Sequence, residues 1–344
     1  MLQCYNQKNK EIKINNRRYL GNKYKLLPFI SDIVKKECKN IYSFADIFAG
    51  TGSVSSLFYD KKIITNDLLY SNYISNLAWF GAQEFDFDKI VEYITNYNEL
   101  EINEENYMTY NFSNTYFSYQ DCAKIGFIRE DIEFKYNIKL INEREKAILI
   151  TSLIYAMDKI ANTCGHYDSY IKDGNYKNKL ELYIPLVNQS NNKANQNYNC
   201  DANELVKNIY ADLVYIDPPY NSRQYSDAYH LLENVSKWDK PKVYGTAKKM
   251  DRKNIKSKYC TVEATSVFQD LIKNINAKYI LFSYNNMSSK GNVRSNAKIS
   301  DDDIINVLDT KGKVRVFSMN FKAFSAGKSN INDNEERIFF CECI

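Results

Sequence analysis

A strand, a glycine turn, a helix and a second strand follow one another early in the chain, and this order most restricts the possible fold. Residues 42–48 form a short apolar run that leads into a turn of small residues at 49–53. A helix-like stretch then reaches about residue 59, and a second short strand at 62–65 ends beside Asp67. This order is typical of a βαβ unit, so we expect an α/β fold built on a parallel sheet.

The glycine turn and the acid after the second strand form the first candidate binding site. Gly50 and Gly52 let the backbone turn tightly, and the start of the helix offers free N–H groups to a ligand. The third glycine of a dinucleotide fingerprint is absent, because Ser55 takes its place. In doubly wound folds an acid after the second strand binds ribose hydroxyls, so Asp67 and the turn together indicate a ligand that contains adenosine.

The alternation of strands and helices is interrupted and then returns. After the first βαβ unit the pattern becomes helical and rich in Tyr and Asn, and residues 188–199 are almost wholly polar, which predicts a loop. A strand follows at 213–216, and two strands at 314–321 and 337–343 predict a closing antiparallel hairpin. We therefore expect a catalytic domain interrupted by a helical insertion, with the domain at 17–68 and 196–344 and the insertion at 69–195.

Two adjacent prolines end the apolar run at 212–216. Neither proline offers a backbone N–H, so the strand stops there, and Asp217 and Tyr220 lie in the turn beyond it. This turn shares the rim of the sheet with the glycine turn, and open α/β sheets bind ligands at that rim. A carboxylate, a proline carbonyl and an aromatic ring suit an exocyclic amino group on a planar base, which has two N–H bonds and a face for stacking.

The composition agrees with such a site without requiring it. Lys and Arg number 46 and Asp and Glu 42, and this net charge of +4 is compatible with a polyanionic partner. The eight cysteines form no CxxC pair and have no histidine at metal spacing, so we expect reduced thiols and no metal site. No signal peptide and no apolar run of membrane-spanning length is present, which favours a cytoplasmic protein without a membrane partner.

A basic segment follows the helix after the two prolines. Residues 237–258 hold nine Lys or Arg against two Asp. Such a run is usually a solvated loop, but its position after the two-proline turn favours contact with the phosphates of a polyanionic partner. The residues predicted to bind these phosphates, which would be those of DNA if the partner is DNA, are Arg223, Lys248, Lys249, Arg252 and Lys253.

Three motifs in this order resemble the alpha-group N6-adenine-specific DNA methyltransferases, the class that contains the Dam-type methylases. They are RRYLGNKYKLL at 17–27, FADIFAGTG at 44–52 and DPPY at 217–220. The resemblance spans residues 17–343, although the insertion is matched only by its position. It implies a Rossmann-like methyltransferase sheet that uses S-adenosyl-L-methionine, with a target-recognition insertion, and methylation of the adenine N6 amino group in double-stranded DNA.

The resemblance also assigns the site residues. It implies that the target amino group donates hydrogen bonds to the Asp217 carboxylate and the Pro218 carbonyl, while Tyr220 stacks on a base flipped out of the duplex. Pro219 completes the catalytic tetrapeptide. Tyr19 stands where the family often has Trp. The residues implied to bind the cofactor are Tyr19, Lys23, Asp46, Ala49, Gly50, Thr51, Gly52, Asp67, Asp201 and Asp217, of which Asp201 would contact the cofactor adenine.

Other functions fit parts of the same pattern. DPPY-type turns also occur in RNA adenine methyltransferases, and a decayed fold would leave a DNA-binding module without activity. The first motif and the large insertion favour DNA, and the complete set of glycines and acids disfavours decay. The protein would act as a solitary methylase or as the modification part of a restriction-modification system, whose endonuclease would be a separate chain. One substrate site per event leads us to expect a monomer.

Overall fold

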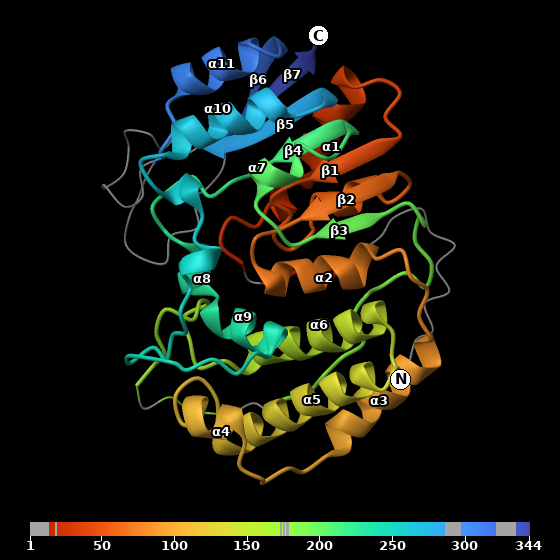
Figure 1. The fold of residues 1–344 in the computed structure, drawn as a ribbon, viewed down its shortest axis with the longest axis vertical. Helices are drawn as coiled ribbons and strands as arrows, with labels where there is room; N and C mark the ends of the chain where they lie inside the picture. Colours follow the sequence, from red (N-terminus) through yellow and green to blue (C-terminus); the bar gives the residue numbers. More distant parts are fainter. Residues whose placement is uncertain are drawn as a thin grey trace.

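The computed structural model describes residues 14–17, 19–172, 174, 176, 179–285, 297–320 and 335–344, and a mixed sheet occupies the upper half of the molecule as drawn in Figure 1. Within these residues seven strands pair in the order β3-β2-β1-β4-β5-β7-β6. Every neighbouring pair is parallel except those made by β7, which runs antiparallel to both β5 and β6. The strands are β1 (Ser43–Asp46), β2 (Lys62–Asn66), β3 (Gln196–Tyr198), β4 (Ala211–Ile216), β5 (Ala277–Asn285), β6 (Gly312–Asn320) and β7 (Glu335–Cys343).

Helices cover both faces of the sheet, so the central strands are apolar on both sides. All six residues of β4 are buried, as expected for a parallel strand inside a covered sheet. Leu213 and Tyr215 face one apolar core, and Val214 and Ile216 face the other, because side chains alternate along a strand. The second core contains residues of α7 (Ala202–Leu205), α10 (Ala264–Asn274) and α11 (Asp301–Asp309).

The first core extends beyond the sheet into a group of helices. It joins α1 (Leu27–Glu37) and α2 (Tyr70–Phe80) to the helices that Figure 1 shows gathered beyond α2. α2 contacts β2 and β3 as well as α6 and α9, and nine of its eleven residues are buried. The remaining helices are α3 (Phe87–Glu99), α4 (Tyr107–Phe112), α5 (Tyr119–Asn137), α6 (Glu143–Ile160), α8 (Tyr225–Ala228) and α9 (His230–Lys237), and the 3-10 helices are η1 (Tyr24–Leu26), η2 (Ser55–Phe58), η3 (Lys253–Ile255) and η4 (Lys258–Cys260).

The α/β sheet and the closing antiparallel hairpin are confirmed, and two details of the sequence prediction are wrong. The helix expected after the glycine turn is only the 3-10 helix η2. The edge strand β3 lies inside the polar segment that predicts a loop. An edge strand needs apolar side chains less than a central one, and Asn197 instead donates from its side chain to Thr65 Oγ1 at 2.7 Å. Composition therefore gives no signal for this strand.

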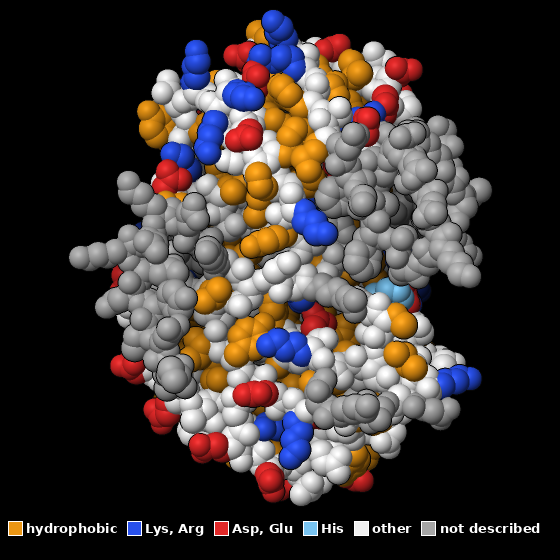
Figure 2. Space-filling model, turned by 180° about the vertical axis from the view of Figure 1, so that it is seen from behind, with side chains coloured by type: hydrophobic (Ala, Val, Ile, Leu, Met, Phe, Trp, Pro, Cys, Tyr) orange, Lys and Arg blue, Asp and Glu red, His pale blue; other side chains and the backbone are white. Residues whose placement is uncertain are grey.

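The division into a catalytic domain and an insertion stays a prediction, although residues 81–160 do contain the four helices α3 to α6. No helix in the described part of the chain is both long and apolar enough to cross a bilayer. The face opposite to that of Figure 1 carries acidic and basic side chains scattered among apolar ones (Figure 2). On this face, contact with a polyanion would therefore depend on local groups of residues more than on a general charge.

Candidate active site

The carboxyl ends of β1, β2 and β4 open onto one cavity of about 1000 Å³, counting the space at its mouth. The three sequence motifs meet there, although they are far apart in the chain. Most of the predicted cofactor-binding residues line this cavity, and Pro219 of the tetrapeptide does so too. These lining residues are Tyr19, Lys23, Asp46, Ala49, Gly50, Thr51, Asp67, Asp201 and Asp217.

The glycine turn is fixed from behind by α2. Gly50 and Gly52 have φ angles of +51° and +80°, a region that favours glycine. A Cβ on Gly52 would lie 2.6 Å from Asn76 Oδ1, so Gly52 supports the turn from the α2 side and does not line the cavity. Asn76 also donates from Nδ2 to the Gly50 carbonyl at 3.0 Å. The Gly50 N–H donates to Asp67 Oδ2 at 2.8 Å, so the acid after β2 holds the same turn.

Asp46 places an unpaired buried oxygen at the cavity. Its Oδ2 accepts a hydrogen bond from Ser55 Oγ at 3.0 Å, whereas its Oδ1 is buried and has no hydrogen-bond partner. The pKa of this carboxyl is raised to about 8, mainly by burial and in smaller part by the nearby Asp217 and Asp67. Burial also raises the pKa of Asp67. A group of buried acids with an unused acceptor suits a positively charged ligand, because an unsatisfied buried acceptor costs about 1–3 kcal/mol.

Lys23 lies against the catalytic candidate Asp217. The two side chains approach to 3.2 Å between Nζ and Oδ1, and the lysine side chain is only 5% exposed. Burial raises the pKa of Asp217 to about 6, although the Lys23 ammonium lowers it. The same ammonium lies 5.7 Å from the centre of the Tyr220 ring. Pro218 and Tyr220 lie outside the cavity lining, so the tetrapeptide presents Asp217 and Pro219 to the cavity.

Tyr19 is held in a buried aromatic group. Its ring stacks on Tyr229 with centroids 4.6 Å apart, and its hydroxyl accepts from Asn72 Nδ2 of α2 at 2.9 Å. The guanidinium carbon of Arg17 lies 5.2 Å from the centre of the Tyr19 ring. Arg17 Nε is also 3.3 Å from Asp158 Oδ2 on α6. The first motif is therefore bound to the helices as well as to the sheet.

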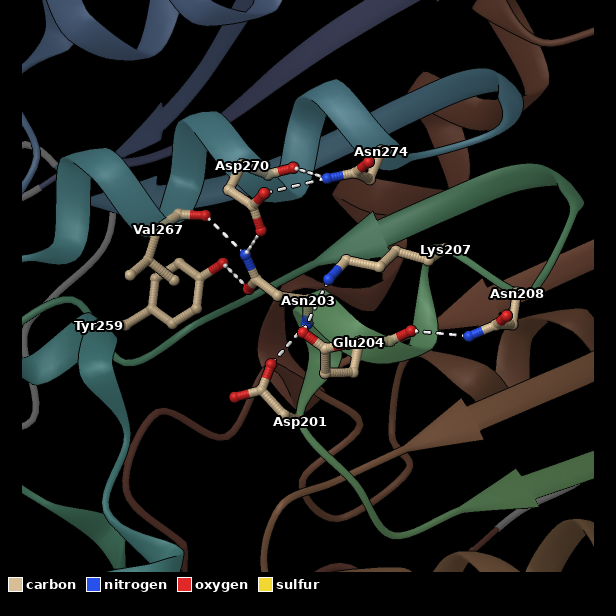
Figure 3. Close-up of polar contacts among 9 residues, drawn as sticks. All are labelled: Asp201, Asn203, Glu204, Lys207, Asn208, Tyr259, Val267, Asp270 and Asn274. Carbon is tan, nitrogen blue, oxygen red and sulfur yellow. Dashed lines mark hydrogen bonds and ion pairs between the residues drawn. The ribbon is translucent and has the colours of Figure 1, made fainter.

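A buried amide builds the opposite wall of the cavity, beside Asp201. Asp201 begins α7 and accepts from the Asn203 N–H at 2.8 Å. The Asn203 side chain accepts from Tyr259 Oη at 3.0 Å, and it donates to the Val267 carbonyl at 2.9 Å (Figure 3). It donates further to Asp270 Oδ2 at 2.7 Å. Tyr259 and Val267 line the cavity, so Asn203 positions the wall without facing the ligand.

The predicted DNA-binding residues lie outside the cavity lining. Lys249 pairs with Asp168 at 2.8 Å and Arg252 with Asp227 at 2.6 Å. Arg223 and Lys253 are exposed, and Lys248 is half-buried in a turn.

The basic segment nevertheless contributes to the cavity, which the sequence analysis missed. Its residues Ile255, Ser257 and Lys258 line the cavity together with Gln224 and Tyr225 from the turn after the tetrapeptide. Ser257 and Gln224 exchange two hydrogen bonds, of 2.8 Å and 3.0 Å. Charge alone gave no sign of this role, because the lining residues are mostly the uncharged ones of the segment.

This fold, with a cavity lined by a glycine turn and buried acids at the rim, defines an α/β protein of the methyltransferase type. Residues 19–294 match the model of the D12 class of N6 adenine-specific DNA methyltransferases, and the chain belongs to this family. The resemblance to N6-adenine DNA methyltransferases is thereby confirmed, while its alpha-group assignment stays a prediction. Membership implies a methyl donor.

No group of three or more His, Cys, Asp or Glu in the described residues could hold a metal ion.

Three relatives show how the chain compares in length. The modification methylase StsI of Streptococcus sanguinis is 36% identical over 93% of this chain and 50% of its own length. The type II methyltransferase M.FokI of Planomicrobium okeanokoites is 33% identical over 94% of this chain and 52% of its own. The chain thus spans about half the length of these two. The type II methyltransferase M.NlaIII of Neisseria lactamica is 30% identical, with 94% and 96% covered.

Proposed function

We propose that the protein is a site-specific DNA methyltransferase that transfers a methyl group from S-adenosyl-L-methionine to the N6 amino group of adenine in double-stranded DNA. The observation that carries this proposal is the meeting of the DPPY turn with the acid-lined cavity at one rim of the sheet. Asp217 belongs to both, so one carboxylate lies where the donor and the acceptor of the methyl group would meet.

The cavity residues fit the proposed cofactor. When bound, S-adenosylmethionine supplies an electrophilic methyl group on a positively charged sulfonium. The unpaired Oδ1 of Asp46 matches such a positive charge. Asp67 would accept from the ribose hydroxyls through the remaining lone pairs of its oxygens. Asp201 and the wall held by Asn203 would contact the adenine of the cofactor. Tyr19 and Lys23 of the first motif would contact the cofactor from another side of the cavity.

The catalytic turn would act through hydrogen bonds and position. The lone pair of the adenine amino group is delocalised into the ring, so the group is a poor nucleophile. Donation of its two N–H bonds to the Asp217 carboxylate and the Pro218 carbonyl would favour a tetrahedral nitrogen whose lone pair points at the methyl group. The nitrogen loses one proton as it gains the methyl group, and the Asp217 carboxylate would accept this proton.

Contact with the duplex would come from the segments around the rim. The target base must leave the stack to reach Asp217, and Tyr220 would stack on its face. Arg223 and Lys253, which are exposed, would contact phosphates together with Lys248. Lys249 and Arg252 are bound to Asp168 and Asp227, so they would also fix the shape of the segment.

The names of the relatives support a proposal for the biological setting. They are named as modification methylases and type II methyltransferases. We infer that this protein likewise supplies the modification activity of a restriction-modification system, acts in the cytoplasm where its DNA substrate lies, and works as a monomer beside a separate endonuclease.

The proposal is tested by methyl transfer from labelled S-adenosylmethionine to unmethylated genomic DNA, followed by nucleoside mass spectrometry. Wild-type protein is expected to form N6-methyladenine, and Asp217→Ala is expected to lower the rate at least about a hundredfold, because it removes an acceptor of the reacting amino group. Label in RNA but not in DNA would show an RNA methyltransferase instead. Cofactor binding without transfer to either nucleic acid would overturn the proposed reaction.

A further inference from the structure

Two buried charges and one partly buried charge form a row at the rim of the sheet. Lys23 Nζ lies 3.2 Å from Asp217 Oδ1 and 3.6 Å from Glu336 Oε2, so one ammonium is shared by two carboxylates. Lys23 and Glu336 are only 5% and 7% exposed. The three residues come from separate parts of the chain: the first motif, the turn after β4 and the start of β7.

The antiparallel direction of β7 brings Glu336 to this rim. Glu336 pairs with Asn285 at the carboxyl end of β5, and β5 lies between β7 and β4. Because β7 runs against β5, its first residues lie at the edge where β4 and β5 end. If β7 ran parallel to β5, its last residues would lie at this edge, and Glu336 would lie at the opposite edge of the sheet.

Stability alone does not explain an acid at this position. The Glu336 Oε2 atom is buried and has no hydrogen-bond partner apart from its ion pair with Lys23. A buried ion pair is often no more stabilising than apolar side chains of similar volume, because both charges lose their hydration. Buried charges of this kind are more common in functional sites, where they adjust neighbouring titratable groups.

We propose that Glu336 is a further positioning residue for methyl transfer: it shares the Lys23 ammonium with Asp217, so that the Asp217 carboxylate keeps an acceptor free for the target amino group. This inference rests on the proposed function, and it adds a residue that lies outside the cavity lining and the DPPY motif. Without the negative charge of Glu336, Lys23 would pair with Asp217 alone and compete with the adenine amino group.

The charges around Asp217 give this role a measurable sign. Lys23 lowers the pKa of Asp217, whereas Glu336 raises it. Among the described residues, Asp46 and the phenols of Tyr215, Tyr220 and Tyr225 also interact with Asp217. These groups remain in place when the charge at position 336 is removed. The pKa of Asp217 should then fall, and its ionised form should persist to lower pH.

The experiment measures kcat/KM for DNA against pH, with S-adenosylmethionine saturating, in the wild type and in Glu336→Gln. Activity of the wild type should be lost as the pH falls to about 6 or below, where Asp217 takes up a proton. Glu336→Gln should move this acid limb to lower pH by about one unit. The Lys23 ammonium then lowers the pKa of Asp217 without the opposing effect of the Glu336 carboxylate. It should also lower the rate on the plateau several-fold.

Two further variants make the test decisive. Glu336→Asp keeps the negative charge but moves it away from Lys23, because the side chain is shorter. Its acid limb should lie between those of the wild type and Glu336→Gln. If Glu336→Gln does not fold, Glu336→Asp alone tests the inference. Glu342→Gln removes a carboxylate from the other end of β7 and should leave the limb unchanged. An unmoved limb in Glu336→Gln and Glu336→Asp would overturn the inference, even if both unfold at lower temperature. Absence of transfer by the wild type would instead overturn the proposed function.

Discussion

At Asp46, burial has left one carboxylate oxygen without a partner, and the residue is therefore expected to change its protonation when a ligand enters. Its pKa of about 8 means that the ligand-free protein holds a proton there at neutral pH. A cationic cofactor stabilises the ionised form and lowers this pKa. Cofactor binding below about pH 8 should thus release a proton, and affinity should rise with pH until Asp46 is ionised in the free protein.

This proton release is measured by titration calorimetry of S-adenosylmethionine at pH 7 in buffers with different ionisation enthalpies. The observed heat should depend on the buffer in the wild type more than in Asp46→Asn, which cannot titrate. Equal dependence on the buffer in the two proteins would show that Asp46 does not interact with the positive charge of the cofactor.

At the scale of elements, Asn203 joins three pieces of chain into one wall of the cavity. α7 carries the amide, η4 supplies the Tyr259 hydroxyl, and α10 supplies Val267 and Asp270 (Figure 3). Asn203→Ala would leave the buried Tyr259 hydroxyl without this partner, which costs about 1–3 kcal/mol of unfolding free energy. Because Tyr259 and Val267 line the cavity, the KM for S-adenosylmethionine should rise more than kcat falls.

The matched control is Asn208→Ala, because Asn208 is another asparagine drawn in Figure 3 but lies at the edge of the polar network. Asn208 is exposed, and its side chain donates only to the Glu204 carbonyl at 3.1 Å. This variant should keep both the stability and the KM of the wild type. The two variants are compared by steady-state kinetics and by thermal unfolding. An equal KM for S-adenosylmethionine in both variants would contradict the role of Asn203.

At the scale of the whole molecule, Arg144 binds α6 to α2 and to the segment that leads to β3. The side chain is buried on α6 and donates to the carbonyls of Ala78, Gln83, Asn188 and Gln189. These carbonyls belong to the end of α2, the turn after it and the segment that leads to β3. Loss of hydration lowers the pKa of the guanidinium to about 10, so it stays charged at neutral pH.

Arg144→Met should therefore destabilise the sheet and the helices together, by more than about 3 kcal/mol, because it leaves several buried carbonyls unsatisfied. Thermal unfolding followed by circular dichroism and by tryptophan fluorescence should show one coincident transition at lower temperature. Lys207→Met, at an exposed ion pair with Glu204, should shift this transition little. Two separate transitions in Arg144→Met would show that the helices unfold as an independent unit.

The sequence allows prediction of features that depend on neighbouring residues, and it fails where distant segments meet. The turn at Gly50 and the stop at Pro218 follow from local backbone chemistry, and both were placed correctly at strand ends. Strand β3 was missed because pairing along one edge needs no apolar pattern. Glu336 was missed because its place depends on the register of β7, which no local signal sets. The roles of the site residues stay predictions until they are tested.

The burial of α2 on nearly all sides has a consequence for engineering new specificity. Asn72 and Asn76 of α2 hold Tyr19 and the glycine turn, while other residues of the same helix pack against α6. A chimera that exchanged residues 69–195 between relatives would replace this helix and disturb the cofactor side of the cavity. The graft should instead begin after Phe80 and end before β3, so that the recipient keeps its own α2 and receives only the helices beyond it.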